Sequence, residues 1–344
     1  MNLSLERKNM ENLVCLTEKE IETFLPSGRL RKVQALMNPA RYSDPASINN
    51  EEDWLDLLSE CNPEVLLAAW KTPRLPENLQ EIAPRLKYVC YLPGSIRNLV
   101  PRSTIENGLL VTSWSSSVSR TISECALLMI LTCMRRVRYW TEEMHFNGGW
   151  KNQETVTQSL FERRVGLHGL GLISQGLVAL LKPFTGKISA FSPSVPDSIY
   201  ADLGVNRTNS LEELFSQNDV IVELAALTPK TKGIVTEDLL RMMPQAGAFV
   251  NVGRGAVVDE EALAKVARER PDFQVALDVH GIEPLPKDSP FRGMQNVLLL
   301  PHLGGPTIDR RRDAGDHSLE NMRRFLSGME LVDLYDLRMY DRSS

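Results

Sequence analysis

Apolar and polar positions alternate in a regular way from about residue 160 onward. Short runs of apolar and β-branched residues recur, and several are followed by stretches with helical spacing, such as TEDLLRMM and DEEALAKVARER. This alternation predicts a doubly wound parallel sheet with helical crossovers. The predicted strands lie in the segments RRVGLHG, KISAFSP, DVIVELA, AFVNVG, QVALDV and VLLLP.

Residues 1 to about 115 carry a smaller version of the same alternation, in LVCL, VLLAA, LKYVCYL and LLVT. The predicted fold class is therefore α/β, with two Rossmann-like doubly wound parallel-sheet domains. The apolar segment TISECALLMILTCMRRV predicts a long helix that joins them, and IDRRRDAGDHSLENMRRFLSG predicts a second connecting helix. The first domain is then discontinuous, at 1–117 plus about 318–344, and the second covers 118–317.

Composition and charge narrow the kinds of partner. A chain of 344 residues suits two domains, and 42% hydrophobic with 24% charged residues is typical of a globular protein. The net charge of −5 without a basic stripe argues against nucleic acid or an anionic membrane, so we expect a small-molecule partner. The N-terminus lacks a signal-peptide pattern, no run of about 18 apolar residues is evident, and the scattered cysteines indicate reduced thiols. We therefore expect a cytoplasmic protein.

The string GLHGLGLISQG raises the question of a nucleotide site, because Gly169 and Gly171 match a dinucleotide fingerprint whose third glycine is here Ser174. A glycine-rich turn without any ligand would show the same letters. The string follows a predicted strand and opens an apolar helix at 172–181, which is the placement that phosphate binding requires. This context favours the nucleotide interpretation, with serine small enough for the packing role of the third position.

The end of the next predicted strand bears on the choice of cofactor. An acidic residue usually accepts hydrogen bonds from the adenosine ribose there, whereas this chain has Ser192. A neutral hydroxyl does not repel a 2′-phosphate, and no arginine follows immediately to bind one. The sequence leaves the choice between NAD and NADP open.

Three residues after later strands suggest a reaction. Arg254 lies between glycines in NVGRG, Glu283 follows the strand that ends near Asp278, and His302 follows VLLLP. A guanidinium can bind a 2-oxo carboxylate as a bidentate fork, although a solvated loop arginine is the alternative. A histidine held by a carboxylate can take up a hydroxyl proton during hydride transfer to nicotinamide.

These strings together resemble the D-2-hydroxyacid dehydrogenase family, which includes phosphoglycerate dehydrogenase, glyoxylate reductase and formate dehydrogenase. The resemblance runs from about residue 86 to 327 and also rests on LTPKTKG and NVLLLPHLGG. It implies an active site in an interdomain cleft, a homodimer, and Arg254, Glu283 and His302 as catalytic residues. It further implies D-stereospecific conversion of a 2-oxo or 2-hydroxy acid, with cofactor contacts from Gly169, Gly171, Leu172, Ile173, Ser192, Ala225, Val252, Gly253, Asp278 and Gly304.

The chain departs from the family at two places. The family's GxGxDN loop, which binds the substrate carboxylate, is LPGSIRN here; Gly94 and Ser95 remain as expected substrate-binding residues beside Arg254 and His302, and Arg97 replaces the acid. The usual HxP before LTP has become LAA. Of the other histidines, we expect a packing or solvent-linked role for His168 and a cleft-wall role for His280. No spacing of histidine, cysteine and carboxylate predicts a metal site.

Two functions remain compatible with the sequence. The first is an NAD(P)-dependent reductase or dehydrogenase of a small 2-oxo or 2-hydroxy acid. The second is an NADH-sensing dimeric binding protein of the C-terminal-binding corepressor type, which has the same fold and triad without metabolic turnover. The identity of the acid and the physiological direction do not follow from the sequence.

Overall fold

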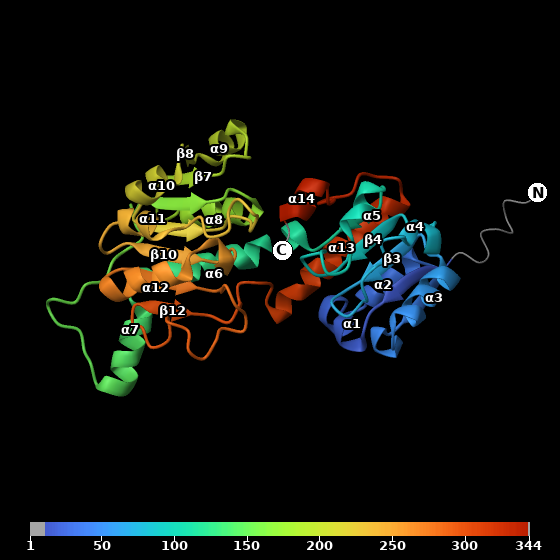
Figure 1. Ribbon diagram of the computed structural model, residues 1–344, viewed down its shortest axis with the longest axis horizontal. Coiled ribbons are helices and arrows are strands. Elements are labelled where there is room, and N and C mark those ends of the chain that lie inside the picture. Colours follow the sequence, from blue (N-terminus) through green and yellow to red (C-terminus); the bar gives the residue numbers. More distant parts are fainter. Residues whose placement is uncertain (1–10, 343–344) are drawn as a thin grey trace, which may run out of the picture. The chain divides into compact units, whose positions relative to one another are not determined.

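The computed structural model describes residues 11–342 and divides into two compact units. Unit 1 comprises the chain up to Val118 and again from Thr307 onward, and unit 2 comprises Ser119–Pro306. Each unit is an α/β structure built on one parallel sheet (Figure 1). The predicted fold class of two parallel-sheet α/β domains is confirmed.

Unit 1 contains a five-stranded sheet in the order β2-β1-β3-β4-β5. The four strands predicted from apolar runs are present, as β1, β3, β4 and β5. Strand β2 was missed because its sequence, ARYS, is polar, and it lies at the sheet edge with its two central residues exposed. The bounds are β1 Asn12–Cys15, β2 Ala40–Ser43, β3 Val65–Ala68, β4 Tyr88–Tyr91 and β5 Leu110–Thr112.

The helices of unit 1 come from both parts of the chain. Helix α13 packs on α1 and α2, and a Cβ on its Gly315 would lie 1.9 Å from the carbonyl oxygen of Phe24, so only glycine permits this close approach. The C-terminal part of the chain therefore completes the core of this unit. The helices are α1 Glu18–Phe24, α2 Arg29–Leu36, α3 Glu51–Cys61, α4 Leu79–Ile82, α5 Arg102–Glu106, α13 Arg311–Leu326 and α14 Leu337–Arg342, with short 3₁₀ turns at Pro45–Ser47 and Ile308–Arg310.

Unit 2 contains a seven-stranded parallel sheet in the order β12-β11-β10-β9-β6-β7-β8. The six predicted strands are present, and the extra strand β8 has only two residues, both exposed, which is too short to give a sequence pattern. The strand order reverses direction between β6 and β9, where open α/β sheets bind their ligands. The bounds are β6 Val165–His168, β7 Ile188–Phe191, β8 Asn206–Arg207, β9 Val220–Glu223, β10 Ala248–Asn251, β11 Gln274–Leu277 and β12 Val297–Leu299.

The helices of unit 2 follow the predicted crossovers. Helix α8 spans Leu172–Leu181 as predicted, and the segments TEDLLRMM and DEEALAKVARER form α11 and α12. Helix α7 and the loop after it extend away from the sheet (Figure 1). The remaining bounds are α7 Val137–Glu142, a π-helical turn at Glu143–Asn147, α9 Asp197–Leu203, α10 Leu211–Gln217, α11 Glu237–Met242, a 3₁₀ turn at Gly255–Val257 and α12 Glu260–Glu269.

Helix α6, Ser115–Met134, is the predicted long apolar helix, and it begins in the serine-rich segment. Among the described residues it is the one helix long and apolar enough to cross a membrane, with a mean hydropathy of 1.3. A core helix meets the same criteria, and Ala126, Met129 and Ile130 are fully buried in the hydrophobic core of unit 2. Leu128, in contrast, is 59% exposed.

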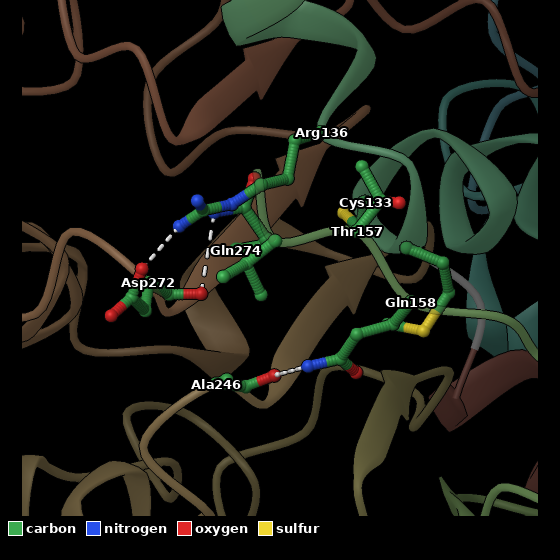
Figure 2. Close-up of a pocket in the computed structure, with 9 residues that line it drawn as sticks. Cys133, Arg136, Thr157, Gln158, Ala246, Asp272 and Gln274 are labelled. Carbon is green, nitrogen blue, oxygen red and sulfur yellow. Dashed lines mark hydrogen bonds and ion pairs between the residues drawn. The ribbon is translucent and has the colours of Figure 1, made fainter. Parts of the chain in front are cut away.

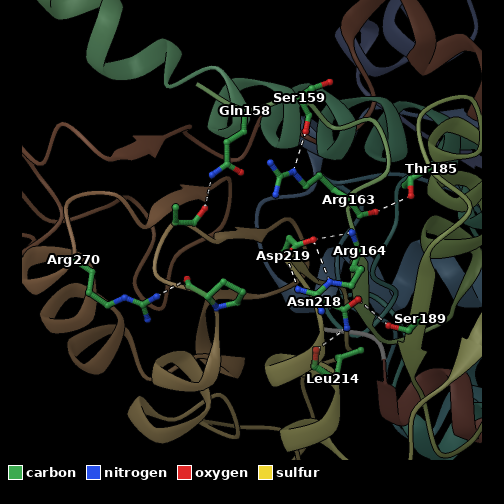
Figure 3. A network of polar contacts seen from close by, with 12 residues as sticks. Gln158, Ser159, Arg163, Arg164, Thr185, Ser189, Leu214, Asn218, Asp219 and Arg270 are labelled. Carbon is green, nitrogen blue, oxygen red and sulfur yellow. Dashed lines mark hydrogen bonds and ion pairs between the residues drawn. The ribbon is translucent and has the colours of Figure 1, made fainter. Parts of the chain in front are cut away.

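Hydrogen bonds from polar side chains connect the loops at the amino ends of the unit 2 strands (Figure 3). The Asp219 carboxylate accepts hydrogen bonds from the backbone N–H and the guanidinium of Arg164, at 3.0 and 2.7 Å. Asn218 accepts from the Ser189 hydroxyl at 3.0 Å and donates to the Leu214 carbonyl at 2.7 Å. These bonds connect the starts of β6, β7 and β9 and leave the carboxyl ends of the same strands for ligands.

Candidate active site

The glycine-rich loop connects β6 to α8. Gly169 has φ +94°, and a Cβ there would lie 2.9 Å from the Leu224 carbonyl oxygen, so the position requires glycine on both counts. A Cβ on Gly171 would meet nothing within 4 Å, which leaves open space at the start of α8. No side chain caps this helix, so the N–H groups of its first turn, at Leu172 and Ile173, can bind an anion.

Ser174, at the third fingerprint position, is buried, and its hydroxyl donates a hydrogen bond of 2.8 Å to the Gly169 carbonyl oxygen. The serine therefore links the first turn of α8 back to the loop that it follows. The departure from the glycine fingerprint adds a hydrogen bond within the loop. The open cradle at Gly171 and the uncapped amides fit the pyrophosphate of a dinucleotide.

The other predicted cofactor residues lie on loops that follow strands of the same sheet. Ser192 follows β7, and its carbonyl oxygen accepts a hydrogen bond of 3.2 Å from the Tyr200 hydroxyl. Ala225 follows β9, and Val252 and Gly253 follow β10. A Cβ on Gly253 would lie 3.1 Å from the Glu223 carbonyl oxygen, so glycine lets these two loops pack closely.

Arg254 lies on the loop after β10. Its guanidinium donates a hydrogen bond of 2.8 Å to the Gly253 carbonyl oxygen. A Cβ on the next residue, Gly255, would come within 2.0 Å of the His280 backbone. Glycine therefore allows the Arg254 loop to pack directly against the loop that carries Glu283.

Glu283 and His302 lie in direct contact after β11 and β12. The Oε2 atom of Glu283 is 2.7 Å from Nδ1 of His302, and Oε1 accepts a hydrogen bond of 3.0 Å from the His280 backbone N–H. Partial burial acts to raise the pKa of Glu283, but the hydrogen bonds from His302 and His280 outweigh it and lower that pKa below its usual value. The carboxylate is therefore ionised at neutral pH, beside a histidine side chain that is 49% exposed.

Asp278 holds the His302 loop in place. Its buried carboxylate accepts hydrogen bonds from the backbone N–H groups of Leu303 and Gly304, at 2.7 and 2.8 Å, and its carbonyl accepts one from the His302 N–H at 2.8 Å. His302 has φ +55°, which a non-glycine residue keeps only where its surroundings impose it. A Cβ on Gly304 would lie 2.6 Å from the Asp278 carboxylate. Sequence reasoning missed this clamp, since it links two strand ends about 25 residues apart.

Gly94 and Ser95 lie in unit 1, after β4. A Cβ on Gly94 would lie 2.4 Å from Nε1 of Trp114, so this loop also requires glycine. Arg97, which replaces the acid of the family loop, donates hydrogen bonds to the carbonyl oxygens of Tyr340 and Asp341. Arg97 therefore connects the loop to α14.

Two further histidines are buried at the carboxyl edge of the unit 2 sheet. Nε2 of His280 is 3.0 Å from the Leu300 carbonyl oxygen. His168 pairs with Glu223, a residue that the sequence analysis did not single out. The run DVIVELA indicated only a strand, and nothing in the local pattern shows that its glutamate faces His168.

The pocket in Figure 2 lies at the opposite edge of this sheet. Its lining includes Gln274 at the start of β11 and Ala246 just before β10, with Arg136, Gln158 and Asp272 around them. Ligands of open α/β sheets bind outside the carboxyl ends of strands, so this pocket is not the cofactor site. Within residues 11–342, no three histidine, cysteine or carboxylate side chains are grouped as metal ligands.

Comparisons with known proteins identify the family of this chain. The family model for the NAD binding domain of D-isomer specific 2-hydroxyacid dehydrogenase matches residues 127–304. A glyoxylate reductase of Aeropyrum pernix is 30% identical, over 79% of this chain and 83% of that protein. A D-3-phosphoglycerate dehydrogenase of Methanocaldococcus jannaschii is 27% identical over 81% of this chain, which spans only 52% of that longer protein.

Solved structures share the fold at lower identity. The apo form of D-mandelate dehydrogenase from Rhodotorula graminis superposes with a TM-score of 0.81 at 19% identity, over 95% of this chain and 98% of that one. An acyclic imino acid reductase in complex with NADPH and D-Arg superposes with a TM-score of 0.75 at 21% identity, over 95% of this chain and all of that one. Taken with the glycine-rich loop and the contact between Glu283 and His302, the matches show that the chain belongs to the D-isomer specific 2-hydroxyacid dehydrogenase family and is an NAD(P)-dependent oxidoreductase.

Proposed function

We propose that Arg254, Glu283 and His302 carry out the interconversion of a small 2-oxo acid and its D-2-hydroxy acid. The observation that carries this proposal is the 2.7 Å contact between Nδ1 of His302 and Glu283, which leaves Nε2 of the same ring for the substrate. Arg254 follows β10, the second strand along the sheet from β12, whose loop carries His302. The three side chains thus follow three consecutive strands of one sheet.

Each residue has a distinct task in this proposal. Bound nicotinamide supplies or accepts the hydride. His302 takes the hydroxyl proton at Nε2 during oxidation and returns it to the carbonyl oxygen during reduction. Glu283 orients the ring through Nδ1 and stabilises its protonated form. Arg254 binds the substrate carboxylate as a fork.

An assay separates this function from the corepressor-type alternative, which no observation here favours. Oxidation of NADH and NADPH is followed with glyoxylate, hydroxypyruvate, pyruvate and bulkier 2-oxo acids. Turnover of any of them supports the proposal. Tight binding of NADH without turnover of every acid tested would instead identify a dinucleotide-sensing binding protein.

The cofactor preference is expected to be weaker than in relatives with an acid after β7. A carboxylate at this position would make a charge-assisted hydrogen bond to the ribose, worth about 1.5 to 3 kcal/mol. Ser192 cannot make this bond, and its neutral hydroxyl does not repel a 2′-phosphate. We expect kcat/KM for NADH to exceed that for NADPH by less than about a thousandfold, or about 4 kcal/mol. Substituting Ser192→Asp should increase the NADH preference. A native preference above that limit would contradict the prediction.

We propose a homodimer formed through the arm, which we define as residues 137–157. Arg136 pairs with Asp272 at 2.5 Å, and Gln158 donates a hydrogen bond of 3.2 Å to the Ala246 carbonyl oxygen, so both ends of the arm are fixed to the sheet (Figure 2). Large apolar side chains on this anchored arm are exposed, with Phe146 at 82% and Trp150 at 71%. Exposed apolar side chains gathered on one element are typical of an interface.

Light scattering at micromolar concentration is expected to give twice the mass of one chain. The double variant Phe146→Glu/Trp150→Glu should give the monomer mass, because two carboxylates would be buried without partners. The variant Phe161→Glu, just outside the arm at another exposed aromatic residue, is the matched control and should remain a dimer. A monomeric native protein would contradict the proposal.

We also propose a cytoplasmic location and a small acid as the partner, without nucleic acid or membrane. The net charge of −5 supports the small-molecule partner. All five cysteines are free thiols, as expected in a reducing compartment. Immunolocalisation of the native chain tests the location.

A further inference from the structure

His168 and Glu223 form a buried pair at the carboxyl edge of the unit 2 sheet. They are the last residues of the neighbouring strands β6 and β9 and lie opposite each other in the register. Nδ1 of His168 is 2.5 Å from Oε2 of Glu223, and the two side chains are only 5% and 0% exposed. Such a pair is costly to bury and calls for an explanation.

Glu223 fixes the orientation of the imidazole. Its second oxygen, Oε1, accepts a hydrogen bond of 2.8 Å from the Ala225 backbone N–H, so the carboxylate is held at both oxygen atoms. A carboxylate only accepts, and Nδ1 therefore carries the proton in this contact. Burial lowers the pKa of His168, but the charge and the hydrogen bond of Glu223 outweigh it, so the net shift is upward.

The other ring nitrogen, Nε2, has no hydrogen-bond partner among residues 11–342. Nε2 of His168 is not fully enclosed by protein. The fully enclosed side-chain nitrogen atoms that lack a partner in this part of the chain belong to Arg270, His280 and Arg311. With the proton on Nδ1, Nε2 of the neutral ring is an acceptor. His168 thus presents an acceptor that is fixed in direction on a side chain nearly surrounded by protein, and a bound ligand can supply the donor.

The position of His168 identifies that ligand. Strand β6 lies between β9 and β7 in the sheet, and the His168 and Phe191 rings are 6.1 Å apart at the ends of β6 and β7. The three loops that follow these strands are the glycine-rich loop, the loop from Ser192 and the loop from Leu224. In a sheet of this order, the glycine-rich loop binds the pyrophosphate and the end of the next strand binds the adenosine ribose.

We propose that His168 is a cofactor-binding residue, which Glu223 orients so that Nε2 accepts a hydrogen bond from the adenosine diphosphate half of the bound dinucleotide. The proposal rests on the dinucleotide site described above and adds a contact outside the fingerprint glycines. The donor is a ribose hydroxyl or the amino group of adenine. An acceptor that is already oriented loses little freedom when the ligand binds, and this increases its contribution to affinity.

The test uses two substitutions that separate the ring nitrogens. The amide nitrogen of His168→Asn lies near the position of Nδ1, so it keeps the bond to Glu223 and loses the acceptor at Nε2. The amide of His168→Gln lies near Nε2, and its oxygen replaces that acceptor. The full-length chain is titrated with NADH, and binding is measured from the NADH fluorescence. It is also titrated with ADP, and binding is measured by calorimetry. Thermal unfolding monitors the fold, and Lys187→Ala, on an exposed residue just before β7 in the same unit, is the control.

We expect His168→Asn to weaken NADH and ADP by the same factor, about tenfold or more, with an unfolding temperature close to that of the native chain. His168→Gln should recover a large part of the affinity for both ligands, and Lys187→Ala should not change the native affinity. Three outcomes would overturn the proposal: native affinity in His168→Asn, a loss confined to NADH, or a loss that follows the unfolding temperature and is not recovered by glutamine. If the native chain bound neither NADH nor NADPH, the proposed function itself would fail.

Discussion

His302→Ala is expected to lower kcat/KM about 10²- to 10⁴-fold in both directions, which is the usual contribution of a positioned acid or base. The substitution removes the group that takes up and returns the hydroxyl proton. The NADH dissociation constant should change little, because the loop at Gly169 and Gly171 is untouched. Steady-state kinetics in both directions, with an NADH titration, provide the measurement. Lys187→Ala, at an exposed residue on the opposite edge of the sheet, is the control.

Glu283→Gln tests the same pair through the pH dependence. Reduction requires protonated His302, and the Glu283 carboxylate, whose pKa is lowered by the contacts with His302 and His280 against the effect of burial, stabilises that form. Without this charge, the rate of reduction should begin to fall at lower pH than in the native enzyme. Oxidation requires the neutral ring, so it should stay active to lower pH. Profiles that overlay those of the native enzyme in both directions would mean that another group assists His302.

Arg254→Ala is expected to lower kcat/KM about 10²- to 10⁴-fold, because two charge-assisted hydrogen bonds of about 1.5 to 3 kcal/mol each are lost. The effect should appear in KM as well as in kcat, since the fork both binds the carboxylate and orients the carbonyl group. Arg254→Lys keeps the charge without the fork and should recover only part of the activity. The measurement is steady-state kinetics with the best acid of the panel.

Arg163→Ala is the matched control for Arg254, because Arg163 lies just before β6, at the amino edge of the same sheet (Figure 3). Its kinetic constants should equal those of the native chain. An unchanged KM in Arg254→Ala would show that another group binds the carboxylate.

The strands that the sequence predicted share one property: each has an apolar run long enough to set a pattern. Strand β2 is polar and β8 has two residues, so neither produces such a run. The glycine-rich loop and the placement of Arg254, Glu283 and His302 after strands were also evident, because the residues after parallel strands meet at one edge.

Contacts between neighbouring strand ends did not follow from the sequence. The Asp278 carboxylate binds backbone N–H groups about 25 residues later, and His168 meets Glu223 across 55 residues. The hydrogen bond from Ser174 to Gly169 likewise depends on the shape of the loop. Local spacing gives the strand ends, but strand order and register decide which side chains meet there.

The discontinuity of unit 1 has a consequence for the order of events on the ribosome. Unit 2 is one uninterrupted segment, whereas the core of unit 1 includes Ala314, Leu319 and Met322 of α13. The ribosome makes α13 only after all of unit 2. The surface of β4 and α1 that α13 covers therefore stays exposed while unit 2 emerges, and the first unit begun is the last to close. If synthesis paused after residue 306, the nascent chain would contain all of unit 2, but unit 1 would still expose the apolar surface that α13 later covers. Chaperones bind exposed apolar surfaces of this kind.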